Sequence, residues 1–196
     1  MIQNKSDLKY YIERDALADG YKGNHPSIIG GWPNTIWKYK IALRKAEYYR
    51  NCGKGLIGKI LERVFLLRYT RLGMKLGYTI PLNVVEDGLS LPHYGTIIIN
   101  GNSHVGKNCR IMAGVVVGST NGVNVAATIG DNVYIGAGAK ILGAIQVGTD
   151  SCIGANAVVT KNVESGITVA GIPAKKISNK ISRINLNPKL FEKGTV

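Results

Sequence analysis

The sequence predicts a mainly β fold, a parallel β-helix of six-residue repeats, with an N-terminal α-helical segment and a short C-terminal tail. The first observation behind this prediction is a row of aliphatic residues at steps of six: Ile99, Val105, Ile111, Val117, Val123, Ile129, Ile135, Ile141, Val147, Ile153 and Val159. The second is glycine, 25 residues of 196, of which 15 lie within 78–171. The third is the net charge of +13, whose excess positive charge lies outside this glycine-rich stretch.

Residues 1–77 are predicted to form a helical head. Ser6 is a candidate N-cap for a helix that runs to about Ala18, and apolar residues at steps of three and four predict further helices over 35–50 and 53–77. Residues 20–33 are rich in glycine, proline and asparagine and are expected to form a loop. We expect the basic side chains of the head to be solvated, namely Lys38, Arg44, Lys45, Arg63 and Arg71.

Residues 78–171 are predicted to form the β-helix. A second residue, small or apolar, follows each aliphatic one by four positions, so both are expected to point into a narrow core. Three repeats would close a coil of 18 residues, which would stack Ile111 on Ile129, Val147 and Ser165. Glycine follows several of the aliphatic residues, where we expect it to relieve the backbone at a corner. The weak repeat over 118–128 predicts a loop that leaves one coil.

The charge divides the chain into the same parts. Residues 1–77 carry +9, residues 78–171 carry −1 and the tail, residues 172–196, carries +5. A nucleic-acid partner is therefore not expected, whereas contact of the basic head with an anionic membrane stays open. The three cysteines form no disulfide framework, and the charged N-terminal stretch does not resemble a signal peptide. These features favour the cytoplasm, with the inner face of the membrane as an alternative.

Several segments resemble the hexapeptide-repeat acyltransferases, in particular serine acetyltransferase and the O-acetyltransferases of capsule and exopolysaccharide synthesis. The resemblance lies in PHYGTIIIN, VVVGSTNG, IGDNVYIGAGAKILGAIQVG, IGANAVV and VAGIPAKKI. It implies a left-handed β-helix, acetyl-CoA as cosubstrate, and a homotrimer whose active sites lie between neighbouring chains. The function it implies is acetyl transfer to a hydroxyl group.

His93 is the candidate general base. It occupies a position in phase with Ile99 and Val105, where an aliphatic residue is expected, and imidazole is suited to accepting a proton near neutral pH. The resemblance assigns the same role to this histidine. Asp87 and Glu86 are candidate partners that would orient the ring, and a backbone carbonyl is the alternative. His104 is expected to be a solvated corner residue, and no metal site is expected.

The resemblance also places coenzyme A along a groove of the β-helix. Small residues there would let the pantetheine arm lie against the backbone, and lysines near the tail would meet its phosphates. The matching positions in this sequence are Gly118, Ser119, Gly136, Ala137, Gly138, Ala155, Lys175 and Lys176.

The acceptor is predicted to be a neutral hydroxyl, most simply on a sugar of a surface polysaccharide. Serine acetyltransferases carry an aspartate before the catalytic histidine, where this chain has Pro92, and an Arg-His pair where residues 124–128 hold no charge. Binding a zwitterion needs charged partners. Serine O-acetylation in cysteine biosynthesis and a non-catalytic trimeric scaffold remain the alternatives.

Overall fold

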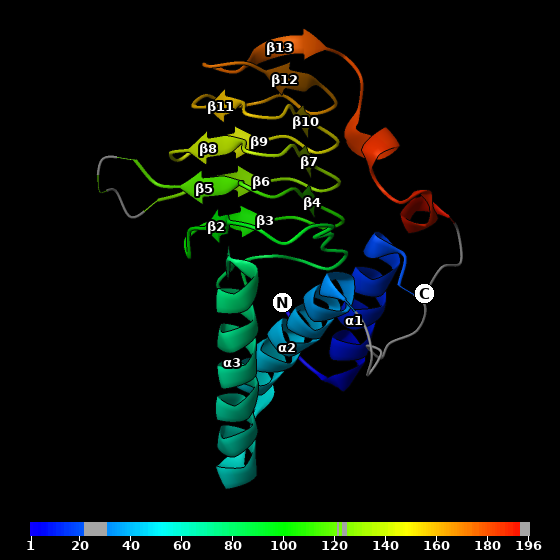
Figure 1. The fold of residues 1–196 in the computed structure, drawn as a ribbon, viewed down its shortest axis with the longest axis vertical. Coiled ribbons are helices and arrows are strands. Elements are labelled where there is room, and N and C mark those ends of the chain that lie inside the picture. The colour runs from blue at the N-terminus through cyan, green and yellow to red at the C-terminus, as the bar shows by residue number, and fades with distance from the viewer. Residues whose placement is uncertain (22–30, 121, 123–124, 193–196) are drawn as a thin grey trace.

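The structure is a computed structural model that describes residues 1–21, 31–120, 122 and 125–192. Three helices form a head at one end of the molecule, and short strands stack above them coil by coil (Figure 1). The third α-helix ends at Leu76 and the first strand begins at Tyr78, so the change from helix to strand comes where the sequence predicts it.

The helices are α1 (Lys5–Asp19), α2 (Trp32–Cys52) and α3 (Gly55–Leu76). The predicted cap Ser6 is wrong, because the Asn4 side chain accepts the N–H of Asp7 and α1 begins one residue before Ser6. Helix α2 begins earlier than predicted, inside the expected loop, and Pro33 suits its first turn because that turn needs no N–H donor there. Most of the predicted loop, residues 22–30, lies outside the described residues.

The strands form three sheets that wrap around one core. The first sheet holds β1 (Tyr78–Thr79), β2 (Ile97–Ile99), β5 (Val116–Gly118), β8 (Lys140–Leu142) and β11 (Val158–Val159). The second holds β3 (His104–Val105), β6 (Thr128–Ile129) and β9 (Gln146–Val147). The third holds β4 (Arg110–Ile111), β7 (Tyr134–Ile135), β10 (Cys152–Ile153), β12 (Thr168–Ala170) and β13 (Lys175–Ser178).

All of these pairings are parallel except the last, because β13 folds back antiparallel on β12. The predicted parallel β-helix is thus present as three sheets. Strand β13 lies beyond residue 171, so the third sheet extends into the predicted tail. Two 3-10 helices follow, Ser182–Asn185 and Pro188–Phe191.

Both predicted inward positions of the repeat are buried. The aliphatic residues Ile129, Ile135 and Ile141 are fully shielded from solvent, and the residues four positions further on are buried with them: Val133, Ala139, Ile145, Ser151, Ala157 and Val163. Burying apolar side chains contributes about 25 cal/mol per Å² of area, so this continuous column is the main stabilising feature of the coils.

The predicted stacking of Ile111 on Ile129 is wrong. Ile111 pairs with Ile135, 24 residues on, whereas Ile135 pairs with Ile153, 18 residues on. The extra six residues fall between β5 and β6. Part of the loop predicted over 118–128, including Val123 of the aliphatic row, lies outside the described residues. The predicted pairing of Val147 with Ser165 is also wrong, because Val147 forms a bridge with Val163 and that coil is two residues shorter.

The glycines after the aliphatic residues allow two coils to approach closely, and they are not needed for a positive φ. A Cβ built on Gly130 or Gly136 would lie 2.7 or 2.6 Å from a backbone nitrogen of the next coil. Neither glycine has a positive φ. The left-handed backbone conformation falls two positions later, on Asn132 (φ 57°) and at most other corners on Asn, Asp or Gly.

A polar ladder runs along one corner of the β-helix. Arg14 of α1 donates to the Asn108 side chain at 2.7 Å, Asn108 donates to Asn132 at 2.9 Å, and Asn132 donates to Asp150 at 2.9 Å. Arg183 of the tail closes the ladder with two bonds to the Asp150 carboxylate, at 2.9 and 3.0 Å. The ladder therefore links the head, the coils and the tail.

Arg44 is not solvated, contrary to the prediction. Its side chain is fully buried and pairs with Asp15 at 2.8 Å and Glu47 at 3.0 Å, while it donates to the carbonyl oxygens of Val85 and Glu86. Burial alone would lower the pKa of the guanidinium, but the two carboxylates raise it above its ordinary value. Arg44 therefore links α2 of the head to the first coil through its hydrogen bonds.

The tail returns to the head. Leu186 and Leu190 pack on Ala18 at the end of α1, and Asn187 donates to the carbonyl oxygen of Leu17 at 2.7 Å. The two ends of the described chain thus form a second, smaller apolar cluster beside the main core.

Candidate functional site

His93 lies on the surface just before β2, not in an inward position of the core. The prediction that it replaces an aliphatic core residue is therefore wrong in its geometry. The first coil is irregular between β1 and β2, and Leu89 and Leu91 fill its core instead. The ring is exposed, as a base that must meet a substrate hydroxyl has to be.

Neighbouring groups hold the His93 segment in place. The Tyr78 hydroxyl donates to the His93 carbonyl oxygen at 2.5 Å, and burial raises the pKa of that hydroxyl above its ordinary value, so it keeps its proton. The His93 ring packs against Trp32 of α2 with centroids 5.7 Å apart. Asp19 accepts the Leu91 N–H at 3.3 Å, which anchors the chain two residues upstream. The backbone around the histidine is thereby preorganised.

Glu86 and Asp87, the predicted orienting partners, are held by α1. Glu86 accepts a hydrogen bond from the hydroxyl of Tyr11. Burial would raise the pKa of the Glu86 carboxyl, but this bond and the N-terminal amine outweigh burial and lower that pKa. Asp87 pairs with Arg14 at 3.6 Å, and burial raises the pKa of Asp87. Among the described residues no carboxylate contacts the His93 ring. The structure therefore does not support the predicted role of Glu86 or Asp87 in orienting that ring.

Three of the predicted coenzyme A residues share the corner between the third and first sheets with Ala155. They are Gly136, Ala137 and Gly138, which follow β7 directly. Ala137 and Ala155 are exposed one coil apart, where the Asn156 N–H donates to the Ala137 carbonyl at 2.8 Å. Gly138 has φ 73°, the left-handed conformation that Asn or Asp adopts at other corners, so its glycine is explained by the turn without a ligand.

A column of small residues leads from this corner to the His93 segment. The Gly138 N–H donates to the Ala113 carbonyl, and a Cβ on Gly95 would lie 3.2 Å from the Ala113 Cβ. Gly95, Ala113, Ala137 and Ala155 therefore follow one another up the corner above His93. Small side chains leave this corner open to a narrow, extended ligand.

The remaining predicted residues lie elsewhere. Gly118 is the last residue of β5 and Ser119 follows it, on the way from the first sheet to the second, where Ser119 accepts from the Asn100 side chain at 3.4 Å. Lys175 and Lys176 are exposed on β13 at the top of the third sheet, and Lys176 is 3.9 Å from Glu164. A single chain therefore does not gather all eight residues around one cavity.

The structure adds residues that the sequence analysis missed. Ala113 repeats the Ala-Gly step of Ala137, and this match was hidden because the inserted loop makes the spacing 24 residues instead of 18. A hollow of about 420 Å³ lies beside Pro92, the residue before His93, and its wall includes Asp19, Tyr21 and Arg110. Asp19 is already paired with Lys40 at 2.7 Å, so Arg110 is the charged side chain that this wall offers next to the histidine segment.

His104 is an exposed residue of β3, beside Thr128 of β6. Within the described ranges, no group of three His, Cys, Asp or Glu side chains is arranged to hold a metal ion.

Comparisons with known proteins give both a family match and structural neighbours. Residues 126–161 match the family model described as bacterial transferase hexapeptide (six repeats). A comparison with curated protein sequences finds no match.

Several similar solved structures are serine acetyltransferases. The enzyme from Brucella abortus strain S19 is 28% identical, with a TM-score of 0.64 over 90% of this chain and 70% of that one. The same enzyme in complex with coenzyme A gives 28% identity and 0.63, covering 89% and 68% of the two chains. The enzyme from Neisseria gonorrhoeae in complex with serine gives 25% and 0.62, over 89% and 70%. The likeness thus extends over the head as well as the coils.

Proposed function

We propose that this protein is an acetyl-CoA-dependent O-acetyltransferase in which His93 acts as the general base. The main observation behind this proposal is the position of His93. It is exposed, its backbone is anchored, and it lies at the foot of the column of small residues formed by Gly95, Ala113, Ala137 and Ala155. The hexapeptide match and the similarity to serine acetyltransferases, one of them solved with coenzyme A, support the same chemistry. We also infer the left-handed coil and the homotrimer that the sequence resemblance implies.

In this reaction the His93 imidazole accepts the proton of the acceptor hydroxyl as its oxygen attacks the thioester carbonyl. The tetrahedral intermediate collapses by breaking the carbon–sulfur bond, and the imidazolium returns the proton to the departing thiolate of coenzyme A. The products are the O-acetyl ester and free coenzyme A, so the base is regenerated in each cycle. The Tyr78 bond and the Trp32 contact support this step by fixing the base.

For the acceptor, the comparisons favour L-serine, the alternative of the sequence analysis, over a sugar. The similar structures are serine acetyltransferases, and one is solved with serine. The hollow beside Pro92 supports the carboxylate half of this assignment, because the Arg110 guanidinium suits a carboxylate. The Asp19 carboxylate in the same wall is already paired with Lys40 at 2.7 Å.

A neutral sugar hydroxyl is the second candidate. Serine acetyltransferases have an aspartate before the catalytic histidine, where this chain has Pro92, and an Arg-His pair where residues 124–128 are uncharged. The absence of these charges at both places favours a neutral acceptor. Serine bound near His93 would therefore need charged partners at other positions of the chain.

The test is release of the coenzyme A thiol from acetyl-CoA with L-serine, and separately with a panel of free and nucleotide-linked sugars. We expect His93→Ala to lower kcat by about 10²- to 10⁴-fold with its fold intact. Arg110→Gln raises the KM for L-serine if serine is the acceptor, and leaves the rate with a sugar unchanged if a sugar is. Undiminished turnover by His93→Ala would refute the proposed base. Absence of both turnover and coenzyme A binding would favour the scaffold instead.

A further inference from the structure

Helix α3 presents an apolar face to solvent. Leu56 and Ile57 are 75% and 74% exposed, Met74 is 71% exposed, and Ile60, Val64 and Leu67 are each about half exposed. Steps of three, four and seven residues place these side chains along one side of the helix. The side that carries Gly58, Gly73 and Leu76 is buried instead. A surface helix of a globular protein normally points its apolar stripe inward, so an outward stripe calls for a partner.

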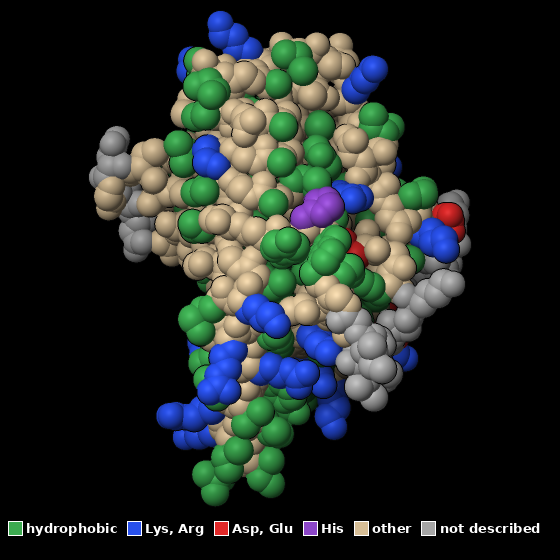
Figure 2. Space-filling model, in the orientation of Figure 1, with side chains coloured by type: hydrophobic (Ala, Val, Ile, Leu, Met, Phe, Trp, Pro, Cys, Tyr) green, Lys and Arg blue, Asp and Glu red, His purple; other side chains and the backbone are tan. Residues whose placement is uncertain are grey.

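The first half of α3 is free to reach such a partner. Figure 1 shows that α3 runs away from the coils, so that its N-terminal end is the part farthest from β13. Figure 2 shows hydrophobic side chains at this far end of the molecule and a cluster of Lys and Arg side chains on the head between this end and the coils.

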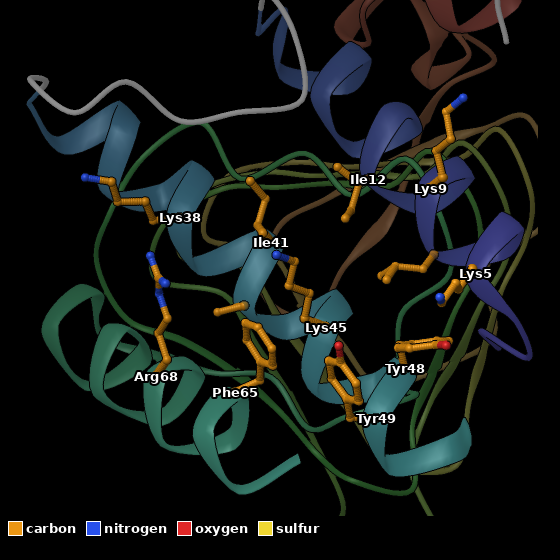
Figure 3. A pocket seen from close by; sticks show the side chains of 12 residues that line it. Lys5, Lys9, Ile12, Lys38, Ile41, Lys45, Tyr48, Tyr49, Phe65 and Arg68 are labelled. Atoms are coloured by element: carbon orange, nitrogen blue, oxygen red, sulfur yellow. The ribbon is translucent and has the colours of Figure 1, made fainter. Parts of the chain in front are cut away.

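A cationic groove of about 540 Å³ opens in the same head, between α1, α2 and α3 (Figure 3). Its floor is apolar and includes Ile41 and Phe65. Five cations line it, and no acidic residue does: Lys5, Lys9, Lys38, Lys45 and Arg68. One of these cations, Lys9, is paired with Glu13 at 3.8 Å.

The groove and the exposed stripe are continuous. A second hollow of about 410 Å³ shares Lys38 and Arg68 with the groove and is also lined by Val64 and Leu67 of the stripe. The head therefore has one extended surface in which apolar side chains alternate with cations.

The charge of this surface decides between two occupants. A second copy of the chain would bring another head of net charge +9 against the first, and like charges repel. The one acidic residue of α3, Glu62, is already paired with Arg50 at 2.5 Å. An apolar stripe bordered by Lys and Arg is the pattern of helices that lie in the interface of an anionic bilayer. No described helix is long and apolar enough to span one.

We propose that the head docks on an anionic lipid bilayer. Leu56, Ile57, Ile60 and Val64 enter the interface between headgroups and acyl chains, and the cationic groove holds acidic headgroups. This surface is separate from the proposed catalytic residues, so the inference does not depend on the proposed acetyl transfer.

The experiment is co-sedimentation of the full chain with vesicles of phosphatidylcholine, alone or mixed with phosphatidylglycerol. We expect binding to the mixed vesicles only, and weaker binding at high salt. Ile57→Glu with Ile60→Glu should lower this binding about tenfold or more, whereas Ile184→Glu, an isoleucine 75% exposed on the tail, should leave it unchanged. Lys45→Glu with Arg68→Glu should lower it similarly, against the control Lys161→Glu with Lys180→Glu.

The outcomes separate the occupants. Equal binding to both kinds of vesicle, or equal loss in the control variants, would overturn the proposal. So would a change in the mass of the assembly in solution on Ile57→Glu with Ile60→Glu while vesicle binding persists, because the stripe would then be a contact between copies. Displacement from the vesicles by inorganic phosphate at low concentration would point to a site for free anions and would also overturn it. Circular dichroism establishes that each variant is folded.

Discussion

At the residue scale, Arg44 shows how much one side chain contributes to joining two parts of the fold. It is fully buried, pairs with Asp15 and Glu47, and donates to two carbonyl oxygens of the first coil. A buried ion pair is costly to form, but removal of one partner leaves the other charge uncompensated.

We predict that Arg44→Met lowers the free energy of unfolding by about 3–5 kcal/mol, because Asp15 and Glu47 would stay buried without their cation. The measurement is chemical denaturation of the variant beside Lys161→Met, a substitution of an exposed lysine that should change stability by less than about 0.5 kcal/mol. Equal midpoints for the two variants would show that the buried pair contributes nothing.

The sequence could not distinguish Arg44 from its solvated neighbours. Lys45 is the next residue and lines an open groove, yet the helix turns Arg44 toward the first coil. The residues that receive it, Val85 and Glu86, are 41 and 42 positions away, and nothing local marks that contact. His93 was predicted by its chemistry and its motif, whereas its exposed position depends on Leu89 and Leu91 filling the core.

At the scale of elements, the hexapeptide period predicts the three sheets but not their register. Any β-helix of this period repeats its inward aliphatic residues, so the core positions follow from the spacing. The register depends on how many residues each corner contains, and the loop between β5 and β6 adds six. The predicted stack of Ile111 and Ile129 failed for this reason alone.

We predict that Gly136→Ala destabilises the β-helix by about 1–3 kcal/mol, because the new methyl group would lie 2.6 Å from the Ala155 nitrogen. Gly118→Ala is the matched control, since its methyl group would meet Leu142 at an ordinary 3.6 Å. Thermal unfolding of both variants decides the point, and a larger loss in Gly118→Ala would contradict it. The KM for acetyl-CoA, measured separately, tests the predicted contact of each glycine with the cosubstrate.

At the scale of the whole molecule, the polar ladder and the returning tail tie the ends of the β-helix together. Arg14 of the head and Arg183 of the tail bind the two ends of a row made by Asn108, Asn132 and Asp150. The Arg183 bonds hold the pKa of Asp150 below its ordinary value of 3.8 and outweigh its partial burial.

We predict that Arg183→Ala loses stability in a pH-dependent way. A lowered folded-state pKa contributes stability above the unfolded value of 3.8, and this contribution disappears as the pH falls through the folded value below 3.8. The difference in denaturation midpoint between wild type and Arg183→Ala should therefore be constant from pH 7 to about pH 5 and shrink below pH 4. Lys180→Ala serves as the control, and a difference that stays constant down to pH 3 would disprove this role of Asp150.

The return of the tail to α1 has a consequence for protein synthesis. The bond from Asn187 to Leu17 joins residues 170 positions apart, and Leu190 and Ala18 lie in the same cluster. At about 5–20 residues per second, a ribosome needs on the order of ten to thirty seconds to make that intervening chain. During this time the end of α1 emerges without its apolar cover, while the coils can add to one another in order. The end of α1 is therefore open to capture by a chaperone until the tail arrives.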